Sequence, residues 1–399
     1  MWKSFKVIDA DAHMHEPKDM WERYVEPKYR DRVPKVAYMD GTFMVYEPDG
    51  KIIPKGQIDS RPPETAWKAL EKKYGEAYHK WWSPDIRLKD MDRHGWDIQV
   101  LLPTGSNGNF DPRAALKDSE IGAALSRAYN NWAYDYCAAA PKRLKFIAVI
   151  ISTEIDEMLS EGRRAVEKLG AVALRNVLLP KGKWLHEPEY DALWALASEL
   201  DVPIAVHGEY RNERFQPFRE LVIREETTGQ RNPYHDPMTL RGLNHAMGFP
   251  YDNMATLGQF IFTGILERFP KLRLAILESN AGWAPFWLGR MDVHTHGRHS
   301  VMGKPEHLTM LPSEYFKRQC TVACDSDEAA LKYVVDFLDG NNIVWNTDYP
   351  HADGMEPARA LPNFDAHPIS DEAKRKILWD NAVNSTGSGC SAKIVSVNT

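Results

Sequence analysis

Residues 5–17 read Phe5-Lys6-Val7-Ile8-Asp9-Ala10-Asp11-Ala12-His13-Met14-His15-Glu16-Pro17, an apolar run that becomes polar toward its end. The beginning is typical of a strand, and every second position then carries an acidic or histidine side chain: Asp9, Asp11, His13 and His15. In an extended chain such side chains leave the same face, so the pattern indicates metal ligands on a strand. Carboxylate and imidazole groups suit zinc, manganese or ferrous iron. The alternative is a half-buried strand whose polar face is acidic and rich in histidine.

Further apolar runs follow the first one, each preceded by a segment with helical spacing. We predict strands at residues 98–103, 146–150, 171–175, 203–207, 272–278, 319–323 and 342–346. Short apolar strands that alternate with helices pair in parallel, and eight of them favour an α/β fold of the (β/α)8 TIM-barrel type. The carboxyl ends of barrel strands form the active-site face. Here those ends carry Asp11, His13, Arg175, His207, Glu278 and Asp348.

The predicted barrel is a single domain over residues 1–387 with two long interruptions. Residues 16–83, inserted after the first strand, lack clean periodicity and are rich in Pro, Lys, Tyr and Trp. Insertions of this length are usually functional, and the aromatic residues argue against disorder, so we expect a lid or an interface. Residues 208–252 are predicted to be an irregular active-site loop insertion, and residues 388–399 a polar C-terminal tail.

The composition of the 399-residue chain is that of a globular protein, with 43% hydrophobic and 27% charged residues. Its net charge of -6 provides no basic field for nucleic acid, so we expect a small-molecule substrate as the partner. The cysteines form no CxxC pair, which indicates neither a disulfide framework nor a cysteine zinc site, and we expect a cytoplasmic protein. No apolar run approaches the roughly 20 residues of a membrane span, so no membrane partner is expected.

Several motifs at the predicted strand ends occur together in one known family. The first strand reads Ile8-Asp9-Ala10-Asp11-Ala12-His13, the fifth ends in Val206-His207, and the eighth continues into Asn346-Thr347-Asp348-Tyr349-Pro350-His351. Residues 264–272 and 377–382 add a helix-to-strand passage and a closing helix. Over most of residues 5–387 the chain thus resembles the metal-dependent hydrolases of the amidohydrolase superfamily. The resemblance is to the branch that includes aminocarboxymuconate-semialdehyde decarboxylase and the resorcylate-type decarboxylases.

The first strand departs from the pattern of that branch at one position. Asp11 stands where a histidine is usual, so the resemblance makes Asp11 and His13 the ligand pair. His15 is then a spare histidine, although a pair of His13 and His15 remains the alternative.

The turn after the sixth strand departs more strongly. Its sequence, Glu278-Ser279-Asn280-Ala281-Gly282-Trp283, lacks the histidine that decarboxylases of the branch usually carry there. The acid–base role of that histidine would then fall to Glu278, or to His235 or His245 from the loop insertion. The alternative for both histidines is a solvated place on a surface loop.

The resemblance implies one divalent metal ion, with zinc the first choice and manganese or iron as alternatives. Its ligands would be the strand-end residues Asp11, His13, His207 and Asp348. Such a site keeps an open position and lowers the pKa of bound water toward about 7, while Asp348 moves the proton. We therefore expect first a hydrolase that acts on a small amide, ester or lactone.

Two other functions remain open. The same site could release CO2 from an aromatic or muconate-type carboxylic acid, or the barrel could bind a small molecule without catalysis. Arg175 would clamp a substrate carboxylate or form a salt bridge at the rim. His351 would donate to Asp348 or to the substrate, or it would cap the final loop. We also expect a homodimer, because Trp and Tyr are enriched in interface cores and occur densely in residues 16–83.

Overall fold

Eight parallel strands form the centre of the computed structural model, which confirms the predicted TIM barrel. The structure describes residues 2–17, 19–33, 35–39, 42–46, 52–53, 63–104, 118–175, 183–208, 237–297, 301 and 305–385. Each predicted strand is present close to its expected position. In chain order, which is also their order around the sheet, the strands are β1 (Ile8–Met14), β5 (Ile98–Pro103), β6 (Leu144–Ala148), β7 (Ala173–Arg175), β8 (Ile204–His207), β9 (Leu274–Leu277), β10 (Cys320–Cys324) and β11 (Ile343–Trp345).

Two backbone hydrogen bonds join β1 to the turn that follows β11. The amide of Asp348 donates to the carbonyl of Asp11 over 3.0 Å, and the amide of His13 donates to the carbonyl of Tyr349 over 2.6 Å. We call residues 9–13 and 347–349 the seam. Because the seam joins the first and last strands at their carboxyl ends, it brings residues from the two ends of the barrel sequence to one place.

Two layers of apolar side chains pack against the strands. The inner layer fills the barrel with residues from several strands, among them Ile8, Val100, Ile147, Leu277 and Val344. The outer and larger layer lies between the strands and the helices. Parallel strands covered on both faces have nearly continuous apolar sequences, and this is why the sequence alone locates them.

An irregularity in β1 changes which of its side chains share a face. The register of β1 against β5 shifts between Asp9 and Ala12. Ala10 packs against the inner layer, whereas Ala12, two residues later, belongs to the outer layer. A bulge of this kind re-aims the side chains that follow it. The expectation that Asp9 leaves the same face as Asp11 and His13 is therefore wrong.

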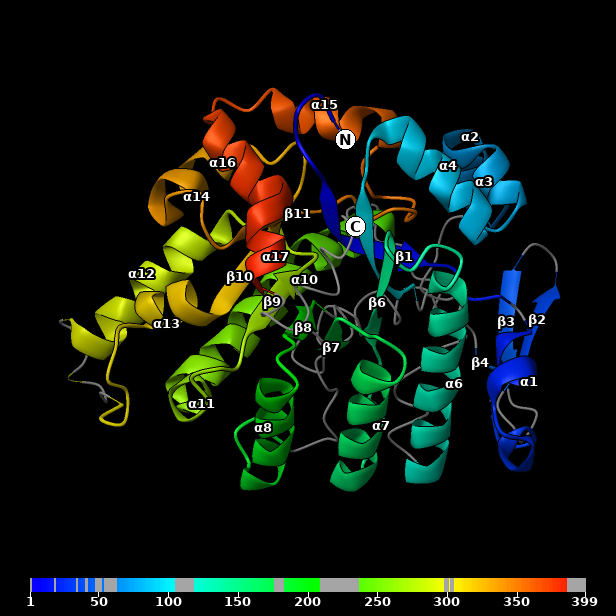
Figure 1. Ribbon diagram of the computed structural model, residues 1–399, viewed down its shortest axis with the longest axis horizontal. Helices are drawn as coiled ribbons and strands as arrows, with labels where there is room; N and C mark the ends of the chain where they lie inside the picture. Colours follow the sequence, from blue (N-terminus) through cyan, green and yellow to red (C-terminus); the bar gives the residue numbers. More distant parts are fainter. Residues whose placement is uncertain are drawn as a thin grey trace.

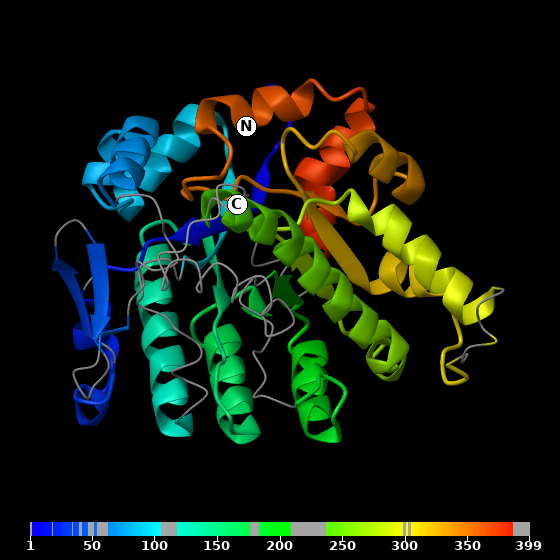
Figure 2. The same cartoon turned by 180° about the vertical axis from the view of Figure 1, so that it is seen from behind.

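Helices surround the barrel, and α6, α7 and α8 stand side by side on one flank (Figures 1 and 2). Helix α6 begins after Asp118, whose carboxylate accepts from the amide of Ile121 over 3.3 Å, and α4 ends at Gly95 in the left-handed conformation that favours glycine. No helix in the described part of the chain is long and apolar enough to cross a membrane. The helices from α4 onward, apart from α10, are α4 (Pro84–His94), α6 (Ser119–Cys137), α7 (Ile155–Glu167), η2 (Pro188–Tyr190), α8 (Asp191–Glu199), α11 (Ile265–Arg268), α12 (Trp283–His296), α13 (Pro312–Gln319), α14 (Leu331–Leu338), α15 (Pro357–Asp365), α16 (Asp371–Arg375), the π-helical η5 (Lys376–Asp380) and α17 (Asn381–Ser385).

The insertion after β1 contains regular elements, although its sequence predicts none. These are α1 (Met20–Tyr24), η1 (Pro27–Tyr29), a small antiparallel sheet of β2 (Lys35–Met39), β3 (Thr42–Tyr46) and β4 (Ile52–Ile53), α2 (Pro63–Tyr74) and α3 (Glu76–His79). The missed signal is Asp40-Gly41, a dipeptide typical of two-residue hairpin turns, which stands between the paired residues Met39 and Thr42. Tyr74 and Trp82 are buried within their own chain, so these two aromatic residues need no partner subunit to cover them.

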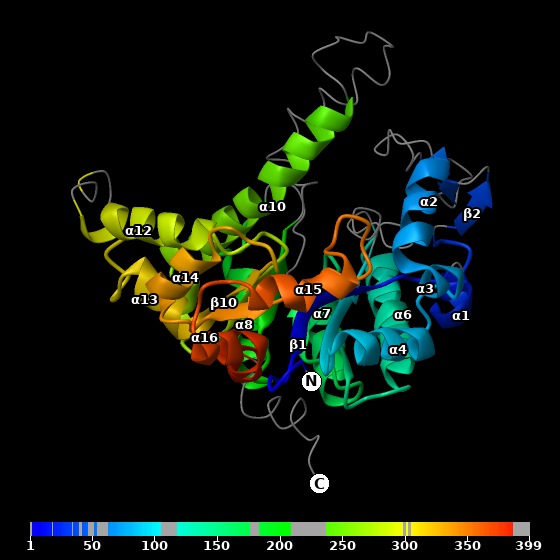
Figure 3. The same cartoon turned by 90° about the horizontal axis from the view of Figure 1, so that it is seen from above.

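Helix α10 (Pro237–Phe262) starts far earlier than the sequence predicts, inside the segment expected to be an irregular loop. Pro250 lies within this helix, although proline usually breaks or kinks one. The helix extends away from the barrel (Figure 3). Residues 209–236 of the predicted loop insertion, with His235, and the predicted tail lie outside the described residues. The division into a domain over 1–387 and a tail stays a prediction.

Candidate metal centre

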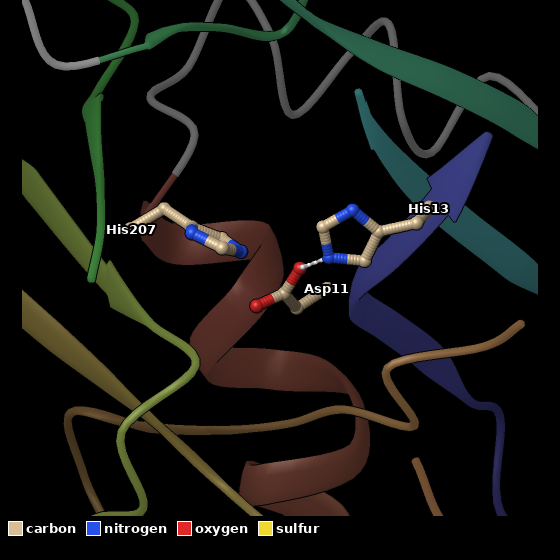
Figure 4. A group of neighbouring side chains, drawn as sticks. All are labelled: Asp11, His13 and His207. Carbon is tan, nitrogen blue, oxygen red and sulfur yellow. Dashed lines mark ion pairs between the residues drawn. The ribbon is translucent and has the colours of Figure 1, made fainter. Parts of the chain in front are cut away.

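Two opposite strands of the barrel bring three predicted ligands together (Figure 4). Asp11 and His13 from β1 and His207 from β8 each offer a ligand atom, and these atoms all lie within 4.8 Å of one another. His13, Asp348 and His351 form a second group that meets the same condition. The predicted ligand set is therefore gathered around His13, which belongs to both groups.

The ring of His13 is oriented by a hydrogen bond on its far side. Its Nδ1 lies 3.0 Å from the carbonyl oxygen of Pro103 and donates to it. This leaves Nε2 with a lone pair, 3.3 Å from Oδ1 of Asp11 and 3.3 Å from Oδ1 of Asp348. Burial lowers the pKa of His13 well below its usual range, and the neighbouring His351 lowers it further. A neutral imidazole whose other nitrogen is held by a carbonyl is the form in which histidine binds metals.

The carboxylate of Asp11 provides the test of whether a metal ion fits here. The side chain is fully buried, and neither of its oxygens accepts a hydrogen bond from the described part of the chain. Burial raises its pKa to about 7, although the charge of His207 opposes the increase. Burying a carboxylate without a donor is costly unless a cation compensates for it. The arrangement fits a divalent ion, but the assignment of the individual ligands stays a prediction.

Glu278 lies directly beside the candidate ligand His207. Its Oε2 is 2.6 Å from Nε2 of His207. Glu278 follows β9 in a left-handed backbone conformation with a φ of 47°, which aims its side chain inward at a cost in strain. Burial, reinforced by the charge of Asp348, raises the pKa of Glu278 well above its usual range. The turn without a histidine thus still delivers a titratable group to the centre.

Asp348 and His351 form a close pair on the seam side. Asp348 also has a left-handed backbone, with a φ of 55°. Nδ1 of His351 lies 2.7 Å from Oδ1 of Asp348, and the ring stacks on that of His13 with centroids 3.9 Å apart. Burial would lower the pKa of His351, but the attraction of Asp348 and the hydrogen bond between them outweigh it and raise the pKa to about 10. His351 therefore holds a proton next to Asp348 at neutral pH.

The other predicted residues belong to neither ligand group. Arg175 ends β7, is half-buried, and its positive charge contributes to lowering the pKa of Asp11. His245 is on α10, where its Nε2 lies 3.2 Å from Oδ2 of Asp353, and both side chains are largely exposed. His15 belongs to neither ligand group, and its ring packs 4.3 Å from the ring of Trp82.

Two residues of the insertion after β1, Lys73 and Tyr74, hold the loop that follows β11. We call this contact the clamp, and the sequence does not predict it. Nζ of Lys73 donates to the carbonyls of His351 over 3.1 Å and Ala352 over 3.2 Å, and also to the carbonyl of Gly354. The hydroxyl of Tyr74 donates to the same carbonyl of His351 over 2.7 Å. No local sequence signal predicts contacts between residues so far apart in the chain. The end of α2 is thus attached to the loop that carries His351.

A barrel with imidazole and carboxylate side chains gathered at the carboxyl ends of its strands has the arrangement of a barrel enzyme with a candidate metal site. The chain belongs to the amidohydrolase family, whose model matches residues 8–384, and it is an enzyme of that superfamily. It is 23% identical over 313 residues to the 2-amino-3-carboxymuconate-6-semialdehyde decarboxylase of Dictyostelium discoideum. The aligned region covers 77% of this chain and 77% of that protein.

Two solved structures illustrate the shared fold. An amidohydrolase from Mycobacterium avium subsp. paratuberculosis superposes with a TM-score of 0.73 at 18% identity, over 96% of this chain and 98% of that chain. The 5-carboxyvanillate decarboxylase of Novosphingobium aromaticivorans, complexed with manganese and 4-hydroxy-3-methoxy-5-nitrobenzoic acid, gives a TM-score of 0.64 at 18% identity, over 96% and 97% of the two chains. At these identities the likeness shows the fold alone.

Proposed function

We propose that this enzyme is a metal-dependent, non-oxidative decarboxylase of an aromatic or muconate-type carboxylic acid. The observation that carries the proposal is the pairing of Nδ1 of His351 with Oδ1 of Asp348 over 2.7 Å beside the candidate metal centre, a contact that raises the pKa of His351. This pair would supply the acid that decarboxylation needs. The turn after β9 contains no histidine that could do so. The names of the relatives, a semialdehyde decarboxylase and a carboxyvanillate decarboxylase, support the same reaction over the hydrolysis expected first.

The proposed ligands are Asp11, His13, His207 and Asp348. When bound, a divalent ion would act as a Lewis acid toward the oxygen atoms of the substrate. Manganese is the preferred ion in this proposal because a similar barrel holds it, and zinc and iron remain compatible with the donor types.

The residues of the chain can carry the remaining steps. Arg175 binds the substrate carboxylate through its fork of donors and orients it toward the centre. Asp348, supplied with a proton by Nδ1 of His351, protonates the carbon that bears the carboxylate. The bond from that carbon to the carboxylate then breaks, its electron pair stays with the substrate, and CO2 leaves. One proton is consumed for each CO2 released, and His351 recovers its proton from solvent.

Hydrolysis is the second candidate because Glu278 lies beside His207. An ionised Glu278 could take a proton from water and would also repel a carboxylate substrate. Burial raises the pKa of Glu278 well above its usual range, and this removes the repulsion when the residue is protonated. Decarboxylation is therefore compatible with Glu278 in this position, and His245 is not needed as the acid.

The test is product analysis with a panel of hydroxylated benzoic and muconate-type acids and of amides, esters and lactones. The wild type is expected to release CO2 from an acid, and Asp348→Asn to lose this activity by about 10²- to 10⁴-fold, the usual contribution of a general acid. The matched control is Asp336→Asn, which should behave as wild type. Asp336 is an exposed carboxylate on α14 that pairs with Lys332. Hydrolysis that Glu278→Gln abolishes, without CO2 release from any acid, would establish the second candidate instead.

A further inference from the structure

Behind the metal centre, Arg87 of α4 is buried with no exposed surface. Its guanidinium donates to the hydroxyl of Tyr136 over 2.8 Å, to Oε1 of Gln99 over 2.9 Å, and to the carbonyl oxygen of His13. All three acceptors are uncharged. The group also lies over the ring of Tyr349, 4.9 Å from its centroid.

Gln99 extends this network across the seam. Its Nε2 donates to Oδ2 of Asp9 over 2.9 Å. The other donors to Asp9 both come from Thr347, whose amide lies 3.0 Å from Oδ1 and whose hydroxyl lies 2.6 Å from Oδ2. Thr347 in turn accepts from the amide of Tyr349 over 3.1 Å, and the residue between these two is Asp348. One continuous chain of hydrogen bonds therefore runs from the carbonyl of His13 to both neighbours of Asp348.

The free-energy cost of burying Arg87 indicates that this network has a role beyond packing. In the described part of the chain the guanidinium of Arg87 donates to neutral acceptors alone, and burying it there costs free energy that an apolar side chain of similar volume would not. Only arginine presents several donors in a rigid plane, so it can hold a backbone carbonyl and a side-chain amide at the same time. The backbone that is held in this way belongs to a candidate ligand, and polar partners behind the ligands of metal sites set ligand orientation.

We propose that Arg87 is a positioning residue that fixes His13 and Asp348 relative to each other. It acts through Gln99 and Asp9 and touches neither the substrate nor the ion. The inference rests on the proposed metal centre and deepens it, because it makes the seam a preorganised half of the site. Without the fork of Arg87, the two ligands would sample a wider range of separations and bind a divalent ion less tightly.

The test measures affinity for Mn²⁺ alone in Arg87→Met and in a matched control, Arg143→Met. Arg143 also uses its guanidinium to hold backbone carbonyls, those of Trp96 over 2.9 Å and Asp97 over 3.1 Å, but it does so at the amino end of β5. Arg87→Met is expected to weaken Mn²⁺ binding by about 10- to 100-fold, the usual cost of losing a partner behind a metal ligand. Arg143→Met should leave the affinity within about 3-fold of wild type, by the same scale.

Arg87→Lys and the visible spectrum of the Co²⁺-loaded protein separate positioning from simple packing. The lysine keeps the charge but not the fork, so it should restore only part of the affinity, and the Co²⁺ bands should shift in Arg87→Met but not in Arg143→Met. Equal losses in the Arg87→Met and Arg143→Met variants, or unchanged affinity in Arg87→Met, would overturn the proposal. Should Arg87→Met fail to fold, Gln99→Met tests the same network. Unchanged Mn²⁺ affinity in Gln99→Met would also overturn the proposal.

The outcome also separates this inference from the proposed function. A wild type that binds neither Mn²⁺ nor Co²⁺ overturns both. A wild type that binds metal and shows the shift in Arg87→Met, but releases no CO2 from any acid, supports the positioning role and refutes the decarboxylase.

Discussion

The seam and the wall that faces it, formed by His207 at the end of β8 and Glu278 after β9, hold their side chains in different ways. In the seam, Asp9 accepts three hydrogen bonds, all from residues that do not enter the ligand set. In the facing wall, two titratable groups meet each other directly, 2.6 Å apart. The difference indicates that partners outside the ligand set hold the seam in position, whereas in the facing wall the candidate ligand His207 contacts the titratable Glu278 directly.

The largest effect should come from the histidine that both ligand groups share. We expect His13→Ala to lose Mn²⁺ affinity by more than about 100-fold, because even partners behind a ligand contribute up to that factor. His15→Ala is the control, since His15 follows His13 by two positions, just after the end of β1, and packs on Trp82 instead. Metal content measured on both purified variants shows which of the two histidines is the ligand. Equal metal loss in the two variants would contradict the assignment of His13 and revive His15 as a ligand.

The second effect concerns the pH dependence of the metal-free protein. Burial raises the pKa of Asp9 and of Asp11 to about 7 in the folded chain, from 3.8. The folded form therefore binds more protons than the unfolded form between about pH 4 and 7, and its free energy of unfolding falls as the pH rises through that window. Urea unfolding after EDTA treatment should show lower stability at pH 8 than at pH 5.

Two additions test the cause of this pH dependence. Mn²⁺ at pH 8 should recover the stability, because it binds the folded form. Asp9→Asn should reduce the slope, since one of the two titrating groups is then removed. If the metal-free protein instead became more stable from pH 5 to pH 8, the ionisation of Asp9 and Asp11 would not be the cause of its pH dependence.

A smaller effect should follow from releasing the clamp on the loop after β11. Lys73→Met removes the ammonium that binds the carbonyls of His351, Ala352 and Gly354. We expect kcat to fall by about 10- to 100-fold, because a misplacement of about 1 Å in a catalytic group has this order of cost. Mn²⁺ affinity should change little, since His351 is not in the proposed ligand set. Lys72→Met, its exposed neighbour on α2, should leave kcat unchanged, and a similar loss there would refute the clamp.

The barrel and its active end could be predicted from sequence because each depends on local patterns. Apolar runs and helical spacing are properties of short segments, and the topology of a parallel barrel then assigns strand ends such as His207 to one face. The orientation of Asp9 could not be predicted, because the bulge in β1 arises from pairing with β5. The contact of Lys73 with the loop of His351 depends on the fold as a whole. Helix α10 contains Pro250, a residue type that rarely lies inside a helix, so its length is not evident from local sequence.

The smallest effect is expected at the rim, where His245 on α10 meets Asp353. Both side chains are largely exposed, 48% and 62%, and exposed ion pairs contribute about 0–1 kcal/mol. The hydrogen bond to Asp353 raises the pKa of His245, so the histidine carries its charge toward neutral pH and can assist the approach of an anionic substrate. We therefore expect His245→Gln to raise KM by a few-fold and to leave kcat and Mn²⁺ affinity close to wild type. Steady-state kinetics across pH measures this directly, with Asp353→Asn as the partner variant. If kcat instead fell by about 10²-fold or more in His245→Gln, the size expected for a general acid, then His245 and not the pair of Asp348 and His351 would be the proton donor.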